Sequence, residues 1–419
     1  MTRPGRVLAA GLWLSLLLTG CTSAGRPATG DLVIGAVYPL TGQNGGDGKL
    51  ELSGLRLAVE LIDQRGGVGG RQVRIVTADA PSEAAAPAAV DSLVDRGIGV
   101  LVGTNGSTIA LPATRRASER GALYLETGAV ADSITARGLP GILRTVATGG
   151  TLGRKAADFA HDFVLPGLKL APAAARTVVL FEGDTYGASV GYGAIDEAGL
   201  MGLNVVDSIS YDAGHTDFTR LAAQVDADRP DLILTASYLE DALAFRHAAL
   251  ARHLKVRAIV GTSSAYCRQD FGDALGQDAV GLYASDKPNQ DINEAALTPA
   301  ARDLLHAARD RYLAEHGGSM SAEAVSGFVG GWVLLHEVAP RAASLSRDDL
   351  WKAAMAVDLP AGSEINGAGV RFAAAGQPDM GQNRRAASVI WEWLSPGHRA
   401  VVYPPAYAQA PPRILSITT

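Results

Sequence analysis

The sequence predicts an α/β protein with two doubly wound parallel sheets, each covered by helices on both faces. Short apolar runs of strand length alternate with amphipathic runs of helix length over most of the 419 residues. This alternation is typical of βαβ units and a parallel sheet. It comes in two successive sets, one starting near residue 31 and the other near residue 148. With 47% hydrophobic and 19% charged residues, the chain has enough apolar material for two cores.

The first set opens with a buried strand and an amphipathic helix. Residues 32–37 form a short apolar run, as expected of a strand inside a parallel sheet. After a loop at 39–48, Leu55, Ala58, Val59 and Ile62 recur at helical spacing and predict a helix from about 49 to 65. The alternation then predicts strands at 71–78, 100–102 and 122–125 and helices at 84–96 and 112–120.

The second set repeats this rhythm. Strands are expected at 177–181, 204–209, 232–235 and 257–261, with helices at 152–164, 189–199, 217–227 and 239–253. Two long helical segments, 298–316 and 322–338, have no strand of their own nearby, so we expect them to pack back onto the first set. A further strand is expected at 388–393. The proline-rich segment 403–413 is expected to be extended or loosely packed.

The N-terminus has the features of a targeting segment. Arg3 and Arg6 precede an apolar run from Val7 to Leu18, which is shorter than the roughly 20 residues that span a bilayer. The run ends in Leu-Thr-Gly-Cys, which resembles a bacterial lipobox with Cys21 as the acylated residue. We therefore expect a lipoprotein signal peptide at 1–20 and a flexible tether at 21–30. An ordinary signal peptide with a chance cysteine is the alternative.

Charge and cysteine content exclude several classes of protein. The formal net charge is −6 and no Lys/Arg-rich run stands out, so we expect no nucleic-acid partner. The two cysteines, Cys21 and Cys267, cannot form a cysteine-rich zinc site. With Cys21 acylated, Cys267 is a lone thiol, and a buried, inert residue is favoured over a reactive one.

Enzyme motifs are weak in this sequence. Ser189 lies in a G-x-S-x-G pattern, but the preceding predicted strand ends at Phe181, whereas a nucleophile elbow follows its strand directly. His336 and Glu337 lack the H-E-x-x-H spacing of a metalloprotease. No G-x-G-x-x-G follows a strand and no P-loop is present. We therefore expect no catalytic residues, no metal and no cofactor.

Several segments carry a resemblance to a known family. They read IGAVYPLTG at 34–42, SGLRLAVELIDQRGGVGGRQV at 53–73, VLVGTNGS at 100–107 and TARG at 135–138, and a Tyr-Gly pair follows the strand at 177–181. The chain resembles the type I periplasmic binding proteins of the branched-chain amino acid transporter family. The resemblance implies two Rossmann-like lobes joined by three crossovers. They would comprise 31–146 with 286–360 and 147–285 with 361–405, followed by a proline-rich tail at 406–419.

The resemblance also implies a ligand site in the cleft between the lobes. Ser107, with Asn105 in the same glycine-rich turn, would hold a ligand carboxylate, because such a turn before a helix offers free N–H groups. The alternative is that Ser107 only caps the helix. Gly128, Ala129 and Val130 would form the next ligand loop. From the second lobe, Tyr186 and Tyr238 would supply aromatic contacts, unless they are packing residues.

Three departures from the family pattern leave the ligand class open. Val130 stands where the family has a threonine, Asp47 stands where it usually has an aromatic residue, and the acidic residue expected near 264–266 is absent. Asp47 would meet a positive group on the ligand or be a solvated loop residue. The ligand is therefore expected to be a small polar molecule, namely an amino acid, an amide or a carboxylate.

Together these features predict a function outside the cytoplasm. The resemblance and the lipobox indicate a lipid-anchored solute-binding protein of an ABC-type importer, with permease and ATPase subunits as separate chains and the binding protein a monomer. The alternative is a ligand-sensing or regulatory envelope lipoprotein of the same fold without a transport role. An envelope enzyme on a similar scaffold would need a catalytic constellation that the sequence does not offer.

Overall fold

The structure is a computed structural model that describes residues 1–2 and 30–417. Residues 3–20 of the predicted signal peptide, residues 21–29 of the tether and the predicted acylation site Cys21 lie outside the described residues. Within the described part of the chain, no helix has the length and apolar character needed to cross a membrane.

The first third of the chain forms a five-stranded parallel sheet in the order β2-β1-β3-β4-β5. Its strands are rich in Val, Leu and Ile and are mostly buried, as the apolar runs predicted. Their bounds are β1 Leu32–Tyr38, β2 Val73–Asp79, β3 Val100–Gly103, β4 Leu123–Glu126 and β5 Ile142–Arg144. The short strand β5 was not predicted.

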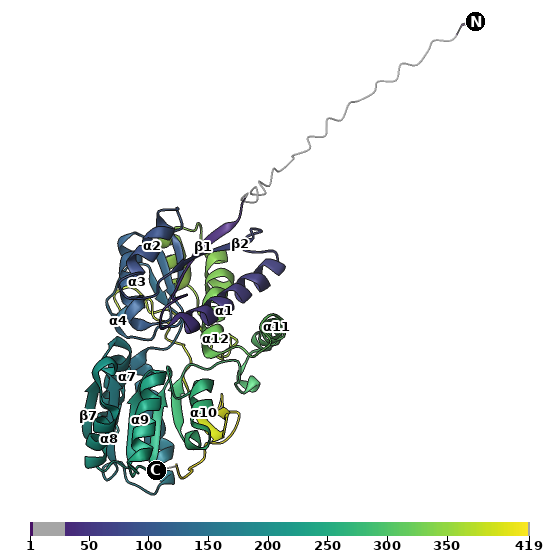
Figure 1. Cartoon of the computed structure of the whole chain (residues 1–419). Helices are drawn as coiled ribbons and strands as arrows, with labels where there is room; N and C mark the ends of the chain where they lie inside the picture. The colour runs from purple at the N-terminus through teal and green to yellow at the C-terminus, as the bar shows by residue number, and fades with distance from the viewer. Residues whose placement is uncertain (3–29, 418–419) are drawn as a thin grey trace.

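Helices cover both faces of this sheet, and we call the sheet with its packed helices the first lobe (Figure 1). The helices between its strands are α1 Gly45–Gln64, α2 Ala86–Val94, α3 Ser107–Glu119 and α4 Ser133–Ala136. Two of them begin earlier than predicted. The helix expected from residue 49 begins at Gly45, and the helix expected from 112 begins at Ser107, with Pro112 inside it. Proline is usual in a first turn, which is why the sequence suggested the later start.

The second sheet has seven strands in the order β12-β11-β10-β9-β8-β6-β7. Strands β6 to β10 run parallel, whereas β11 pairs antiparallel with both β10 and β12. The predicted strand at 388–393 is confirmed as β11; β10 and β12 were not predicted. The strands are β6 Arg176–Glu182, β7 Asn204–Tyr211, β8 Leu232–Ala236, β9 Ala258–Thr262, β10 Tyr283–Asp286, β11 Val389–Ser395 and β12 His398–Tyr403.

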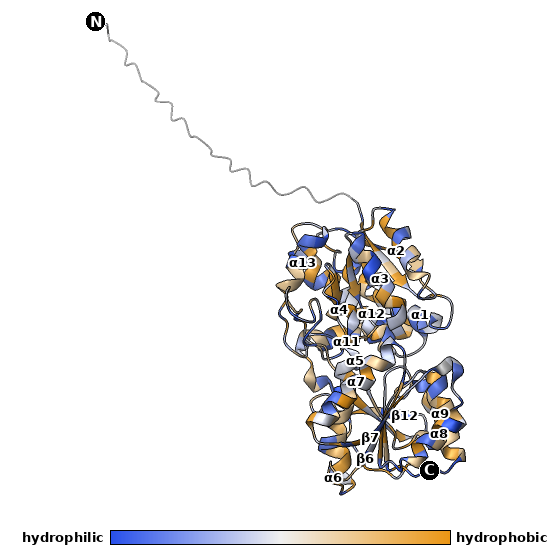
Figure 2. Ribbon diagram, turned by 90° about the vertical axis from the view of Figure 1, so that its left-hand side faces the viewer, coloured by the Kyte–Doolittle hydropathy of each residue, from blue (hydrophilic) through white to orange (hydrophobic). Residues whose placement is uncertain are grey.

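The second sheet with its packed helices forms the second lobe. In Figure 2 its central strands are largely hydrophobic, while the surrounding helices carry both hydrophobic and hydrophilic residues, as expected of helices that bury one face. The helix expected from 189 begins at Thr185, because the Asp184 side chain accepts a hydrogen bond from the Gly187 N–H and caps it. The helices are α5 Gly149–Phe159, α6 Leu165–Gly167, α7 Thr185–Leu200, α8 Phe218–Ala227, α9 Leu239–Ala251 and α10 Gln269–Leu275.

The two long helices after β10 pack back onto the first lobe, as expected. They are α11 Pro299–His316 and α12 Ala322–Trp332. Helix α12 lies so close to α1 that a Cβ added at Gly54 would be 1.8 Å from the Ala324 carbonyl oxygen, and one at Gly327 would be 1.9 Å from the Glu51 carbonyl oxygen. A further helix, α13 Arg347–Met355, packs near β4 and was not predicted.

The connections join the two lobes, and the C-terminal tail packs on the second lobe. Within residues 30–417 the chain passes between the sheets three times: after β5, after β10, and between α13 and β11. The proline-rich segment is not extended throughout, because Tyr403 ends β12 and residues 404–407 form a turn in which the Tyr407 N–H donates to the Pro404 carbonyl. It is not loosely packed either. The Arg413 N–H donates to the Glu392 carboxylate at 2.9 Å, the Tyr283 hydroxyl donates to the Arg413 carbonyl, and Ile417 is buried.

A pocket between the two lobes

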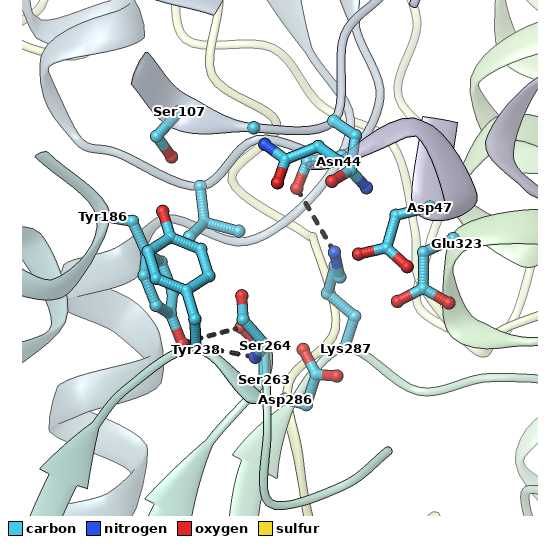
Figure 3. Close-up of a pocket in the computed structure, with 14 residues that line it drawn as sticks. Asn44, Asp47, Ser107, Tyr186, Tyr238, Ser263, Ser264, Asp286, Lys287 and Glu323 are labelled. Atoms are coloured by element: carbon cyan, nitrogen blue, oxygen red, sulfur yellow. Dashed lines mark hydrogen bonds between the residues drawn. The ribbon is translucent and has the colours of Figure 1, made fainter. Parts of the chain in front are cut away.

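A polar cavity of about 50 Å³ lies where the carboxyl ends of the parallel strands of both sheets face each other. This is the edge at which α/β sheets bind ligands. A single water molecule needs roughly 10–15 Å³ of such space, so the cavity has room for a few groups of that size. The lining residues, most of them labelled in Figure 3, are Asn44, Asp47, Asn105, Gly106, Ser107, Gly128, Val130, Tyr186, Tyr238, Ser263, Ser264, Asp286, Lys287 and Glu323.

The structure brings together nearly all the residues predicted to bind ligand. Seven of the eight line the pocket, and Ala129 alone does not. Its N–H donates to the Glu126 carboxylate at 2.9 Å and its carbonyl faces the Arg144 guanidinium, so its backbone supports the loop from behind. That the seven contact a ligand stays a prediction.

A buried carboxylate shapes the first-lobe side of the pocket. Glu126 ends β4 and is fully buried. One carboxylate oxygen accepts from the N–H groups of Thr127, Gly128 and Ala129, and the other accepts from the N–H and hydroxyl of Thr104. Glu126 thereby fixes the two loops after β3 and β4. Burial raises its pKa to about 7, although these hydrogen bonds oppose the rise.

Ser107 is the first residue of α3, and the N-cap is Gly106, which offers no side-chain bond. The alternative that Ser107 caps the helix is therefore wrong. Its Oγ instead accepts from the Ala131 N–H at 3.1 Å, which leaves the hydroxyl proton free to donate. The hydroxyl and the first N–H groups of α3 together form the kind of site that binds an anion.

The two predicted tyrosines form the second-lobe wall. The rings of Tyr186 and Tyr238 lie 5.1 Å apart at 46°. The Tyr186 hydroxyl bonds to Thr262 Oγ1 at 3.0 Å and accepts at 3.3 Å from the Ser263 hydroxyl. The Tyr238 hydroxyl donates to Asp184 at 2.6 Å. Both hydroxyls are engaged by the second lobe, so the tyrosines offer mainly ring surface to the cavity.

Asp47 is not the solvated loop residue that one expectation made it, and a contact with a positive group on the ligand stays a prediction. It lies in the first turn of α1 rather than in a solvated loop, and it forms an ion pair with Arg268 Nη1 at 2.7 Å. Arg268 belongs to the second lobe, directly before α10, so this ion pair spans the cleft. Burial and Glu323 raise the pKa of Asp47, while Arg268 opposes the rise. In this closed arrangement the positive partner of Asp47 is the protein's own guanidinium.

Sequence reasoning missed seven lining residues. Four of them follow or end strands β9 and β10, namely Ser263, Ser264, Asp286 and Lys287. Glu323 lies in the first turn of α12, and Asn44 and Gly106 are the N-cap residues of α1 and α3. Because β10 was not predicted, the charged pair Asp286-Lys287 had no assigned position. The apolar run before this pair was the available signal, since polar residues at the carboxyl end of a parallel strand face the cleft.

The residues considered for catalysis lie in structural roles. Ser189 is on α7, where its hydroxyl donates to the Thr185 carbonyl at 2.9 Å and accepts from the Asp132 N–H at 3.1 Å. His336 bonds to its neighbour Glu337. Cys267 is buried, as expected, and its thiol donates to the Ser263 carbonyl and the Asp286 carboxylate. Burial raises the pKa of this thiol well above its usual value, which keeps it unreactive.

Comparison with known proteins identifies the family. A family model described as periplasmic binding protein matches residues 31–386. The chain belongs to the periplasmic binding protein family. Its architecture of two α/β lobes with a pocket between them is the type I fold of that family, in the branch that includes the branched-chain amino acid-binding proteins.

Relatives in this family are distant in sequence and close in shape. The chain is 28% identical over 401 residues to a Leu/Ile/Val-binding protein homolog of Brucella suis, covering 95% of this chain and 96% of that one. LivJ of Streptococcus pneumoniae, solved with isoleucine, is 19% identical with a TM-score of 0.70 over 89% of this chain and all of its own. A solute-binding protein of R. palustris, solved with benzoate, is 22% identical with a TM-score of 0.70 over 92% of this chain and 99% of its own.

Proposed function

We propose that this periplasmic binding protein is the extracytoplasmic solute-binding component of an ABC-type importer. The observation that carries the proposal is the small polar pocket enclosed between the carboxyl ends of two sets of parallel strands. Ser107 and the N-terminus of α3 give it a site for an anionic group, and two tyrosine rings form the opposite wall. Family membership and the isoleucine and benzoate complexes of relatives support capture of a small carboxylate-bearing molecule.

The proposed mechanism is closure of two lobes on one ligand. The lobes comprise 31–146 with 286–360 and 147–285 with 361–405. Ligand would bind one lobe first and then stabilise the closed form, because only the closed form lets both walls contact it. The closed form is what a permease and its ATPase would recognise. The protein acts as a monomer, and acylated Cys21 holds it to the membrane surface. No step in this cycle requires bond-making by the protein, so we propose that it is not an enzyme.

A thermal-shift screen tests this proposal. The library would hold amino acids, small amides, aliphatic and aromatic carboxylates and short peptides. A ligand that binds only the folded state at 100 times its Kd should stabilise it by about 2.7 kcal/mol. We expect at least one compound to raise the melting temperature of the wild type but not that of Ser107→Ala or Tyr186→Ala. A folded protein that no compound stabilises would favour the regulatory lipoprotein instead.

A further inference from the structure

The segment after β10 places an ammonium group in the wall of the pocket. Lys287 is 7% exposed, and its Nζ donates to the Gly128 carbonyl oxygen at 3.2 Å. Among the residues that the structure describes, no carboxylate oxygen forms an ion pair with Lys287 within 4.0 Å. An ammonium has three N–H donors, and this is its single hydrogen bond to the described chain. Lys287 therefore has donors left for a ligand.

The ammonium of Lys287 stays charged at neutral pH. Burial alone would lower its pKa, but the carboxylates of Asp286, Glu323 and Glu51 act in the opposite direction and raise it. These carboxylates lie too far from the Lys287 Nζ to form an ion pair with it, yet near enough to favour the protonated form of Lys287. A buried charge with unused donors is costly unless a further partner satisfies it. A ligand bound in the pocket can provide that partner for the unused N–H donors of Lys287.

Donors for an anion converge on the same space. In Figure 3 the Lys287 side chain reaches into the middle of the pocket, with Ser107 and the two tyrosines on one side and Asp47 and Glu323 on the other. The Ser107 hydroxyl and the uncapped N–H groups of the 13-residue helix α3 face the cavity with it. A fixed ammonium, a hydroxyl and a helix N-terminus together match a carboxylate.

A ligand ammonium, in contrast, would find several of the acceptors in the pocket already engaged. The Gly128 carbonyl accepts from Lys287, and the side chain of Val130 has no polar atom. Asp47 is paired with Arg268, and one oxygen of Asp286 accepts from the Cys267 thiol. Any ligand ammonium directed at the remaining carboxylate oxygens would lie beside the positive charge of Lys287.

We propose, on the basis of the function proposed above, that the ligand is a carboxylate that carries no amino group, and that Lys287 is the specificity-determining residue that pairs with it. The protein thus supplies the cation that an amino acid would otherwise bring. The buried Oδ1 of Asp286 has no hydrogen-bond partner among the described residues. A ligand hydroxyl would give it a donor without adding positive charge, so hydroxy acids should be the best ligands of this class.

A matched ligand series tests the inference on the unaltered protein. Alanine, lactate and propionate share one carbon skeleton and differ only at the α-carbon, which carries an ammonium group, a hydroxyl group or a hydrogen atom in its place. Leucine, 2-hydroxy-4-methylpentanoate and 4-methylpentanoate form a larger set of the same kind. Titration calorimetry with the full-length protein in detergent should show that, in the set that fits, the hydroxy acid binds at least about tenfold more tightly than the amino acid.

The variant Lys287→Met tests the residue itself. It should weaken binding of the hydroxy acid by about tenfold or more and reduce or reverse its advantage over the amino acid. Lys255→Met removes an equal charge from an exposed surface position and should change neither affinity. If Lys287→Met fails to fold, the wild-type series still decides the ligand class.

Other results would overturn the inference in distinguishable ways. If an amino acid binds as tightly as its hydroxy analogue, or if only a compound without a carboxylate binds, the inference fails and the proposed function stands. The same holds if Lys287→Met folds and binds the hydroxy acid as the wild type does. If no compound of either the series or the wider screen binds the folded protein, the inference about the ligand and the proposed function both fail.

Discussion

Single buried carboxylates control the geometry of this pocket. Glu126 receives five hydrogen bonds and ties the loop after β3 to the loop after β4. Glu51 lies beneath Gly128, where a Cβ added to that glycine would be 2.1 Å from Glu51 Oε1. Because Gly128 has no side chain, the loop can pass directly over the Glu51 carboxyl. In this position the Gly128 carbonyl accepts the hydrogen bond from Lys287.

Replacing Glu126 with glutamine should damage both stability and binding. In Glu126→Gln an amide NH₂ replaces one carboxylate oxygen and faces N–H donors that it cannot accept from. We expect the free energy of unfolding to fall by about 3 kcal/mol, measured by urea denaturation. Glu83→Gln, at an exposed position, is the control and should change stability by less than about 0.5 kcal/mol. Equal stability of the two variants would contradict the role given to Glu126.

Stability should fall as the pH rises toward neutrality. Burial raises the pKa of Glu126 to about 7 and the pKa of Glu51 well above its usual value. Between pH 4.5 and 7 the native state therefore binds more protons than the unfolded state, so its stability is greatest below this window and declines through it. For Glu126 the decline is about 3 kcal/mol. The ligand-free protein should melt at a higher temperature at pH 5 than at pH 7.5.

Glu51→Gln should reduce this pH dependence. Burial opposes ionisation of the Glu51 carboxyl, whose oxygens have no well-formed hydrogen bond among the described residues. Replacing the carboxyl with a neutral amide of similar shape removes that cost near neutral pH. We expect the difference in melting temperature between pH 5 and pH 7.5 to shrink relative to wild type. An unchanged difference would show that Glu51 does not titrate in this range.

At the scale of helices and strands, helix starts decided how well the site could be predicted. The periodicity of apolar residues correctly gave α1 and α3 but not their first turns, because glycines and polar residues fill those turns. Asp47 therefore looked like a loop residue, although it lies in α1 opposite Arg268. Ser107 was placed correctly because its glycine-rich turn follows a clear strand. Lys287 was missed because the apolar run before the Asp286-Lys287 pair was not recognised as the strand β10.

The ion pair between α1 and the start of α10 should favour the closed form. Asp47→Asn removes the contact across the cleft, whereas Asp270→Asn removes another partner of Arg268 within the second lobe. Because both side chains of the Asp47–Arg268 pair are partly solvated, we expect Asp47→Asn to cost about 0.5–1 kcal/mol, or a two- to fivefold weaker affinity by calorimetry. Asp270→Asn should leave the affinity unchanged. Equal effects of the two variants on affinity would argue that the Asp47–Arg268 ion pair does not stabilise the closed form.

The close packing of α1 on α12 predicts a strong difference between two glycines of one helix. Gly54→Ala would place a Cβ 1.8 Å from the Ala324 carbonyl oxygen, so the helices must separate. We expect a loss of about 3 kcal/mol in unfolding free energy. Gly46→Ala, at the start of the same helix, meets no atom within 4 Å and should be neutral or slightly stabilising. Similar stabilities in thermal unfolding would contradict this packing.

At the scale of the whole molecule, the βαβ rhythm was enough to predict two α/β lobes and the return of α11 and α12 to the first of them. It was not enough to predict the antiparallel edge of the second sheet. There β12 has only a short apolar run, Ala400 to Val402, and the tail after it is proline-rich. The tail is held by contacts between Arg413 and the distant residues Glu392 and Tyr283. Such contacts leave no local pattern.

The proposed anchor makes a prediction about where the whole molecule is found. Acylation needs the Cys21 thiol, so Cys21→Ser should abolish incorporation of radiolabelled palmitate and move the protein from the membrane fraction to the soluble fraction. Cys267→Ser, which alters the buried thiol, should leave both labelling and membrane association as in wild type. Continued labelling of Cys21→Ser would show that the anchor is elsewhere.

The most direct test of the central claim is a crystal structure of the protein with a ligand taken from the thermal-shift screen. We expect electron density for the ligand in the pocket, with its carboxylate within hydrogen-bond distance of the Ser107 hydroxyl and the Lys287 ammonium, and with Tyr186 and Tyr238 on its other side. Density for the ligand at another site, with this pocket filled only by water, would contradict the claim that the molecule captures its solute between the two lobes.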